Sequence, residues 1–418
     1  MTGVAAPPRR RGRAGALGAK ARSWAPAMMS AAASVIVTVA SLLIARFDGF
    51  GAFGTFVAMQ AIGVILGIPM LLGVHVNASR AMAARADGGA VAGTALVVVT
   101  GASLLVSAGY AGLLALAPVP DAARLWPAAA LGASVSVMSL AESLLRIRGR
   151  QVLASGLRLA GAGGYLLALV AVLAGGHGDA GTYAALFAAA NAVCAALMLL
   201  GLRPAAGWDA GLARTLLREG WVYSTGQSLL LLLFGFDVIL LMQASGPAAV
   251  AVYALYIGSC RRVIGVLFTD SLASLLIASL SRTGSSSSGR VALRHAPRLL
   301  GLAAAGASGV VLASLAAAGA LHRLEAGWVA LTAIGCSAHA LVFVLFCVFT
   351  VQPALGLARI RTALTVAFVP GLALQAAGAA VGGVLGMIAA FAALNVALAW
   401  RFLVIIRRST AGAPPVQY

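Results

Sequence analysis

The sequence predicts an all-α integral membrane protein of about twelve transmembrane helices in two six-helix lobes, with both termini in the cytoplasm. Three observations predict this fold class. The composition is 61% hydrophobic and 9% charged, whereas soluble domains contain about 25% charged residues. Apolar runs of roughly 20 residues, enough to cross a bilayer as a helix, recur to the end of the chain. Basic residues gather in alternate loops, as they do on the cytoplasmic side of membrane proteins.

The apolar runs predict helices rather than barrel strands, because runs such as SAAASVIVTVASLLIA and SLLLLLFGFDVILLMQ do not alternate between apolar and polar residues. The predicted spans, in chain order, are 28–45, 53–74, 91–117, 126–145, 159–175, 181–202, 221–243, 250–280, 299–320, 326–350, 362–381 and 384–406. These spans divide six and six around a polar stretch near the middle of the chain. That stretch is the predicted boundary between the lobes.

The positions of the basic residues give the predicted topology. The basic clusters fall in every second loop, and the opposite side has only Arg46, Arg124 and Arg323. The resulting divisions are a basic cytoplasmic tail (1–27), an N-terminal lobe (28–202), a cytoplasmic inter-lobe loop (203–220), a C-terminal lobe (221–406) and a second cytoplasmic tail (407–418). The net charge of +19 is spread over these loops rather than gathered on one face, so we expect no nucleic-acid partner. The Ser-rich stretch at 281–290 is predicted to be a flexible linker.

The sequence offers no motif for catalysis or for metal binding. It contains no Ser–His arrangement, no pair of placed carboxylates and no metal-binding box. The four cysteines lie in apolar runs without C-x-x-C spacing, so neither a disulfide framework nor a zinc site is expected. Cys336 and His339 share a helix face, but two ligands do not make a metal site. We therefore expect a protein that is not an enzyme and that has no cofactor.

Two predicted outer turns resemble each other. The segment DGFGAFGTFV at 48–57 follows the first span, and SGPAAVAVYA at 245–254 follows the seventh. Aligned without gaps, Gly49 matches Gly246 and Gly54 matches Ala251. Glycine permits a tight turn, and small residues allow two helices to approach closely. We predict that the two segments are equivalent hinges in the two lobes.

The same stretches resemble a known family. ARFDGFGAFGTF and LLREGWVYSTGQSLLLLLFGFDVILLMQASGPAAVAVYALY are similar to the first and seventh helices, with their following turns, of the polysaccharide-exporter and lipid-linked oligosaccharide flippase branch of the multidrug, oligosaccharidyl-lipid and polysaccharide flippase superfamily. The resemblance implies alternating access in the cytoplasmic membrane. It also implies a polyprenyl-diphosphate-linked oligosaccharide as substrate, for the synthesis of cell-surface polysaccharide. Membrane lipids, a polysaccharide polymerase and glycosyltransferases are the implied partners.

Arg261 and Arg262 lie near the middle of the eighth predicted span, where a charged side chain costs at least roughly 2.5–3.5 kcal/mol unless it reaches water or a partner. Adjacent helical positions point about 100° apart, so one arginine can face a central cavity while the other pairs or packs. The resemblance implies a diphosphate group, which a guanidinium can hold with two parallel hydrogen bonds. In the alternative interpretation, both arginines pair with Asp237 and Asp270.

Other charged residues are candidates for ion pairing or ion coupling. Asp237 either neutralises one of the arginines or binds a coupling cation. Glu142 and Arg146 are spaced four residues apart on one helix and are expected to pair. Arg46 and Asp48 flank the first outer turn, either as a pair at the membrane interface or as a gate that contacts substrate.

Two other functions remain as alternatives to the flippase. A drug/cation antiporter of the same fold would need buried carboxylates, whereas acids within the spans are few and the arginines disfavour a cation. A polyprenol-dependent glycosyltransferase or polymerase would need an outer acid such as Asp48, Asp121 or Asp179, and such enzymes usually have a large outer domain. Every predicted outer loop here is short. The sequence therefore favours the flippase.

Overall fold

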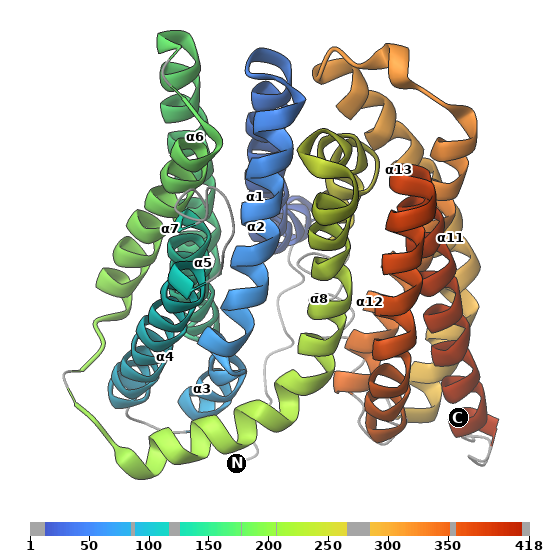
Figure 1. The fold of residues 1–418 in the computed structure, drawn as a ribbon. Coiled ribbons are helices and arrows are strands. Elements are labelled where there is room, and N and C mark those ends of the chain that lie inside the picture. The colour runs from blue at the N-terminus through green and yellow to red at the C-terminus, as the bar shows by residue number, and fades with distance from the viewer. Residues whose placement is uncertain are drawn as a thin grey trace, which may run out of the picture.

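The computed structural model describes residues 13–84, 88–116, 126–176, 178–205, 207–265, 285–351 and 357–411. Within these ranges the chain is helical and contains no strand (Figure 1). The first lobe contains α1 (Arg13–Phe47), α2 (Gly49–Leu71), α3 (Val74–Ala84), α4 (Gly88–Leu116), α5 (Pro127–Ile147), α6 (Gln151–Gly175) and α7 (Ala180–Leu202). The second contains α8 (Ala210–Tyr253), the π-helical η2 (Ala254–Gly258), α9 (Ser259–Ile264), α11 (Ser285–Ala317), the short η4 (Leu321–Arg323), α12 (Ala326–Val351) and α13 (Leu357–Ala411). The predicted all-α, two-lobed architecture is confirmed, and the cytoplasmic location of the termini stays a prediction.

Ten helical segments among the described residues are long and apolar enough to cross a membrane. Two of them, Ser228–Ile264 and Leu357–Ser409, contain a residue with non-helical backbone angles, at Gly246 and Gly383 respectively. A straight helix of 53 residues would be about 80 Å long, far more than the roughly 30 Å of a hydrocarbon core. Each broken segment is therefore long enough to cross twice, so the described residues provide twelve candidate crossings. Both breaks fall between spans that the sequence separates, at 243–250 and 381–384.

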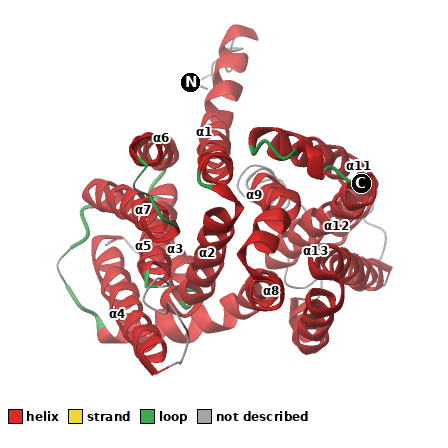
Figure 2. Cartoon of the chain, turned by 45° about the horizontal axis from the view of Figure 1, so that its top comes forward, coloured by secondary structure: helices red, strands yellow, loops and turns green. Residues whose placement is uncertain are grey.

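The two lobes stand side by side and meet where α1 and α2 face α8 and α9 (Figures 1 and 2). One apolar cluster extends across this interface, and a second fills the half of the first lobe around α3, α4 and α5. At Gly54 of α2 the two lobes approach so closely that an added Cβ would overlap the carbonyl oxygen of Pro247. Further along the same pair of helices, a Cβ on Gly235 would lie 3.1 Å from the side chain of Ile65. Small residues thus allow α2 and α8 to run in close contact.

The connection between the lobes differs from the expected loop at 203–220, because it becomes helical at Ala210. Asp209 caps the new helix by accepting a hydrogen bond from the Leu212 backbone N–H at 2.9 Å, which satisfies one of the free donors of the first turn. α8 then runs along the base of the first lobe before turning upward (Figure 1). Asn77 of α3 donates to the carbonyl of Leu216 at 3.2 Å and fixes α8 there.

Three other segments differ from the prediction. α1 starts at Arg13, inside the predicted tail 1–27, and α3 is a short helix in the segment predicted as the loop between the second and third spans. The predicted Ser-rich linker at 281–290 is helical from Ser285, and residues 281–284 lie outside the described ranges. Serine is favoured at helix starts because its hydroxyl can accept a bond from a free backbone N–H. The low-complexity composition of this segment therefore did not indicate a flexible linker over its described residues.

A cationic cavity as candidate functional site

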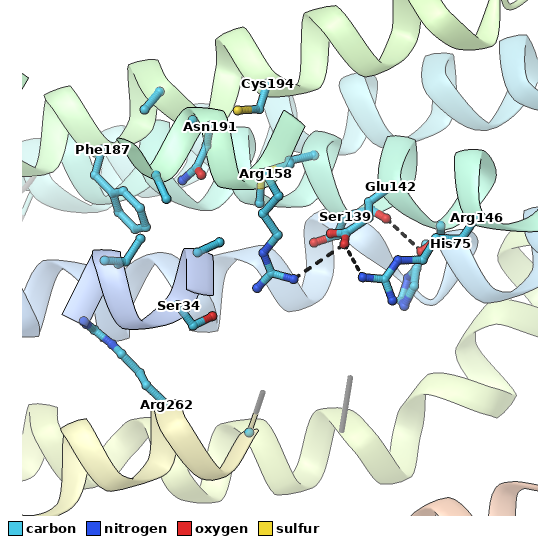
Figure 3. Close-up of a pocket in the computed structure, with 18 of the residues that line it drawn as sticks. Ser34, His75, Ser139, Glu142, Arg146, Arg158, Phe187, Asn191, Cys194 and Arg262 are labelled. Carbon is cyan, nitrogen blue, oxygen red and sulfur yellow. Dashed lines mark hydrogen bonds and ion pairs between the residues drawn. The ribbon is translucent and has the colours of Figure 1, made fainter. Parts of the chain in front are cut away.

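A cavity of about 540 Å³ lies mainly in the first lobe, between α1, α5, α6 and α7, and α9 of the second lobe closes one side (Figure 3). Its long axis runs from Phe187 and Asn191 of α7 at one end to Arg146 of α5 and His75 of α3 at the other. The charged residues that line it are Glu142, Arg146, Arg158, Arg261 and Arg262. The cavity therefore combines side chains from both lobes.

Glu142 gathers two arginines at the end near α3. Its Oε1 accepts from Nη2 of Arg146 at 2.5 Å, one helical turn further along α5. Nη1 of Arg158, from α6, lies 3.5 Å from the same oxygen. Nη2 of Arg146 also lies 3.4 Å from the hydroxyl of Ser30 in α1. Among the described residues, one carboxylate thus faces two guanidinium groups at this end.

Arg262 projects from α9 toward the first lobe. Its Nη1 donates to the hydroxyl of Ser41 in α1 at 2.9 Å, and its Nη2 donates to Oε1 of Gln60 in α2. Both acceptors are neutral, and within the described residues no carboxylate forms an ion pair with Arg262. The guanidinium therefore links the lobes by hydrogen bonds while its charge remains available to a ligand.

Arg261, its neighbour, is bound within the second lobe instead. Its Nη1 donates to Oδ2 of Asp237 at 2.6 Å, its Nη2 donates to the carbonyl of Phe234, and the Phe391 ring centre lies 5.7 Å from its Cζ. Asp237 is fully buried and also accepts hydrogen bonds from Tyr253 Oη at 2.6 Å and from the Val238 backbone N–H at 2.7 Å. The charge of Arg261 is thus neutralised inside the lobe.

The charges around the cavity do not cancel. In the described ranges, four arginines and one glutamate line it. When Asp237 is counted behind Arg261, four positive charges face two negative ones. An uncompensated charge in a low-dielectric cavity is costly, so this arrangement suits an anionic ligand. A guanidinium group also presents paired donors that match phosphate oxygens.

The residues predicted around the first outer turn, Arg46 and Asp48, are not among the residues that line the cavity. Oδ2 of Asp48 accepts a hydrogen bond from Tyr183 Oη at 3.0 Å. The Arg46 guanidinium lies beside Gly319, 3.7 Å from where a Cβ would be. In the described part of the chain, Arg46 and Asp48 form no ion pair with each other. Asp270 lies outside the described residues.

The two predicted hinge turns have similar backbone conformations. Gly49 has a φ of 90° and Gly246 a φ of 79°, a region that residues with a Cβ rarely adopt. Gly54 contacts the second lobe at Pro247, and Ala251 is fully buried. The aligned glycines thus occupy corresponding turns, one at the start of α2 and the other within the broken α8.

Sequence reasoning missed three residues of the cavity region. Arg158 was assigned to a cytoplasmic loop, but α6 begins at Gln151, so Arg158 lies about two turns inside the helix. Ser41 and Gln60 were not singled out, because only the folded chain brings them to Arg262. If the predicted span had begun near Gln151 instead of at 159, Arg158 would have been recognised as a charged residue within a helix. No local pattern indicates the other two.

Comparison with known proteins places the fold. No protein-family profile and no curated protein matches the chain. Among solved structures, a ligand complex of the MATE multidrug transporter DinF-BH matches with a TM-score of 0.63 and 16% identity, over 96% of this chain and 97% of that chain. A MOP superfamily transporter from Pyrococcus furiosus Vc1 (DSM3638) matches with a TM-score of 0.62 and 13% identity, over 92% and 94%.

A MATE family transporter of the MOP superfamily in an inward-facing conformation also matches, with a TM-score of 0.55 and 15% identity, over 90% of this chain and 95% of that chain. The chain therefore has the two-lobed fold of MATE transporters of the MOP superfamily. This is the superfamily that the sequence of the two outer turns resembles. At these identities the likeness establishes the architecture, and the function has to be argued from the cavity.

Proposed function

We propose that this protein is an alternating-access flippase that moves a polyprenyl-diphosphate-linked oligosaccharide across the cytoplasmic membrane. The excess positive charge of the cavity carries this proposal, because four lining arginines face Glu142 and the buried Asp237. The fold supports a transport function, since its structural neighbours are transporters. The MOP transporter from Pyrococcus furiosus is described as having a binding pocket of reverse polarity that suggests a different function, so pocket charge varies within this fold.

In this proposal the arginines divide the binding of the diphosphate. Arg146 and Arg158 attract the anion at the end near α3, and Arg262 binds it deeper in the cavity with paired hydrogen bonds. A volume of about 540 Å³ is typical of a small-molecule pocket. It accommodates the diphosphate with its adjoining sugar, while the polyprenyl chain extends into the bilayer.

Arg262 also couples binding to movement. The substrate competes with Ser41 and Gln60 for the same guanidinium donors. Binding therefore removes two hydrogen bonds between the lobes and favours a conformation in which the lobes have moved apart at this level. A ligand shifts a conformational equilibrium only through such a difference in interactions between the two states.

The test is binding to the purified protein in nanodiscs. A short-chain polyprenyl diphosphate, the matching monophosphate and a lipophilic cationic dye are titrated in parallel. We expect the diphosphate to bind most tightly and Arg262→Gln to weaken it by about 10–100-fold, since hydrogen bonds to charged groups contribute about 1.5–3 kcal/mol. Arg214→Gln, at an exposed position on α8, is the control and should bind like the wild type. Tight binding of the dye without binding of the diphosphate would refute the proposal.

A drug/cation antiporter is the second candidate, and Glu142 is the observation that favours it. Its carboxylate lies at the cavity wall and is partly accessible, with 12% of the side chain exposed. In an antiporter this acid would exchange a proton or sodium ion for a cationic drug. Glu142→Gln should then abolish binding of the dye, whereas in the flippase it should strengthen binding of the diphosphate.

A further inference from the structure

A second hollow, of about 790 Å³, lies between the two arms of α13 on either side of the break at Gly383. On each arm the lining residues recur every three or four positions, so one face of each helix forms a wall. α13 lies at the edge of the second lobe, away from the cationic cavity described above (Figure 2). We call this hollow the α13 groove.

The α13 groove is apolar along most of its length and basic at one end. Arg359 on the first arm and Arg401 and Arg408 on the second are its charged lining residues, and no acid from the described part of the chain lines it. All three arginines are exposed. Within the described residues, none of the three donates a hydrogen bond or forms an ion pair. The apolar part includes Val366, which is 69% exposed.

The depth of the three arginines matches the headgroup layer of a bilayer. Arg359 and Arg408 lie near the two ends of α13, on the predicted cytoplasmic side. Arg401 lies two turns further in, about 10 Å along the helix. Trp400, adjacent to it, is 64% exposed, and exposed tryptophan is typical of the membrane interface. The apolar wall continues from this level toward the middle of the membrane.

We propose that the α13 groove binds an anionic phospholipid of the cytoplasmic leaflet. The phosphate is held by Arg359, Arg401 and Arg408, and an acyl chain lies along the apolar wall past Val366 and Leu394. Basic pockets between transmembrane helices on the cytoplasmic side bind anionic headgroups in this way. The groove lies on an exposed face of a membrane-spanning helix pair and contains three guanidinium groups without a described partner, so both its charge and its apolar length match this ligand. The site is independent of the transported substrate.

The experiment reconstitutes the full chain in nanodiscs that contain equal amounts of phosphatidylglycerol, cardiolipin and phosphatidylcholine, with a small amount of polyprenyl phosphate. Lipids that stay bound after transfer to detergent are counted by native mass spectrometry. We expect the wild type to retain phosphatidylglycerol or cardiolipin in preference to phosphatidylcholine and polyprenyl phosphate. Replacing Arg359, Arg401 and Arg408 with Gln should reduce that retention by roughly fivefold for each arginine.

Two further variants separate the groove from general surface charge. The triple variant Arg203→Gln, Arg214→Gln and Arg218→Gln removes the same charge from exposed positions near the start of α8 and should retain the lipid. Ala363→Trp keeps every arginine, fills the apolar wall and should reduce retention of the lipid. It also tests the groove if the arginine variant folds poorly.

Equal retention of anionic lipid by the wild type, the arginine variant and Ala363→Trp would overturn the proposal. Retention of polyprenyl phosphate instead of phospholipid would overturn it too, because the groove would then bind the carrier of the substrate. A failure of the flippase proposal would show in the binding of the diphosphate and not in these spectra.

Discussion

Glu142 in the first lobe and Asp237 in the second both pair with arginine inside the membrane, but their surroundings differ. Asp237 is fully buried and accepts three hydrogen bonds, from Tyr253, Val238 and Arg261. Glu142 lies at the wall of a cavity, where two arginines share it. A buried carboxylate whose hydrogen bonds are all formed within the protein stabilises the fold. A carboxylate that pairs with two arginines beside an open cavity leaves positive charge that a ligand can neutralise. Asp237 and Arg261 thus form a structural ion pair, whereas Glu142 belongs to the proposed binding site.

The largest effect should come from the buried pair. Asp237→Ala leaves the guanidinium of Arg261 and the hydroxyl of Tyr253 without their acceptor, and we expect the free energy of unfolding to fall by about 3–5 kcal/mol. Unfolding in detergent and abundance in the membrane measure this change. The double variant with Arg261→Met should recover much of the loss, because no unpaired charge remains. Wild-type stability of the single variant would contradict a structural role for this pair.

The contact between the lobes at Gly54 should be the next most sensitive. Gly54→Leu adds a side chain where even a Cβ overlaps the carbonyl of Pro247, and overpacking of this kind typically costs about 1–3 kcal/mol. We expect flipping of a fluorescent polyprenyl-diphosphate probe in proteoliposomes to stop while the protein remains in the membrane. Gly51→Leu on the same helix is the matched control, since a Cβ there meets nothing within 4 Å. Normal flipping by the Gly54 variant would show that this contact does not open and close.

Glu142→Gln tests the open side of the comparison. Removing this acid leaves Arg146 and Arg158 without their shared counter-ion, so the cavity becomes more positive. We expect the affinity for the polyprenyl diphosphate to rise about fivefold, from an electrostatic change on the order of 1 kcal/mol. Titration at low and high salt measures it, and the gain should shrink at high salt. A lower affinity for the diphosphate would mean that the carboxylate itself contacts the ligand.

The smallest change in stability is expected for Arg262→Gln. The variant loses the hydrogen bonds to Ser41 and Gln60, but it also removes a membrane charge that has no acid partner among the described residues. These effects oppose each other, so the free energy of unfolding should stay within about 1 kcal/mol of the wild type. The same unfolding assay used for Asp237→Ala measures it. A loss as large as that of Asp237→Ala would make Arg262 a structural residue as well.

Much of the architecture could be predicted from the sequence, because bilayer thickness limits the length of each apolar helix. The breaks at Gly246 and Gly383 fall between predicted spans. The lengths of the apolar runs were therefore enough to predict where the chain turns. The helical start of α8 at Ala210 was missed, since that segment is amphipathic and polar enough to resemble a loop. Local sequence patterns therefore predicted the membrane-spanning helices better than they predicted helices on the surface.

The cavity was less predictable, because its contacts join distant parts of the chain. Arg261 and Arg262 stood out as charges inside an apolar span. Their different roles depend on partners that neighbouring sequence does not reveal, since Ser41 and Gln60 lie 221 and 202 positions from Arg262. Only the pairing of Glu142 with Arg146 follows from helical spacing.

The helical connection between the lobes has a mechanical consequence. α8 is held against the first lobe by Asn77 and continues without a break to Gly246, inside the second lobe. A helix keeps its length along the chain even where it bends, whereas an irregular loop with the same number of residues can extend or contract. The connection is therefore a helical link of fixed length, so a displacement of one lobe pulls on the base of the other.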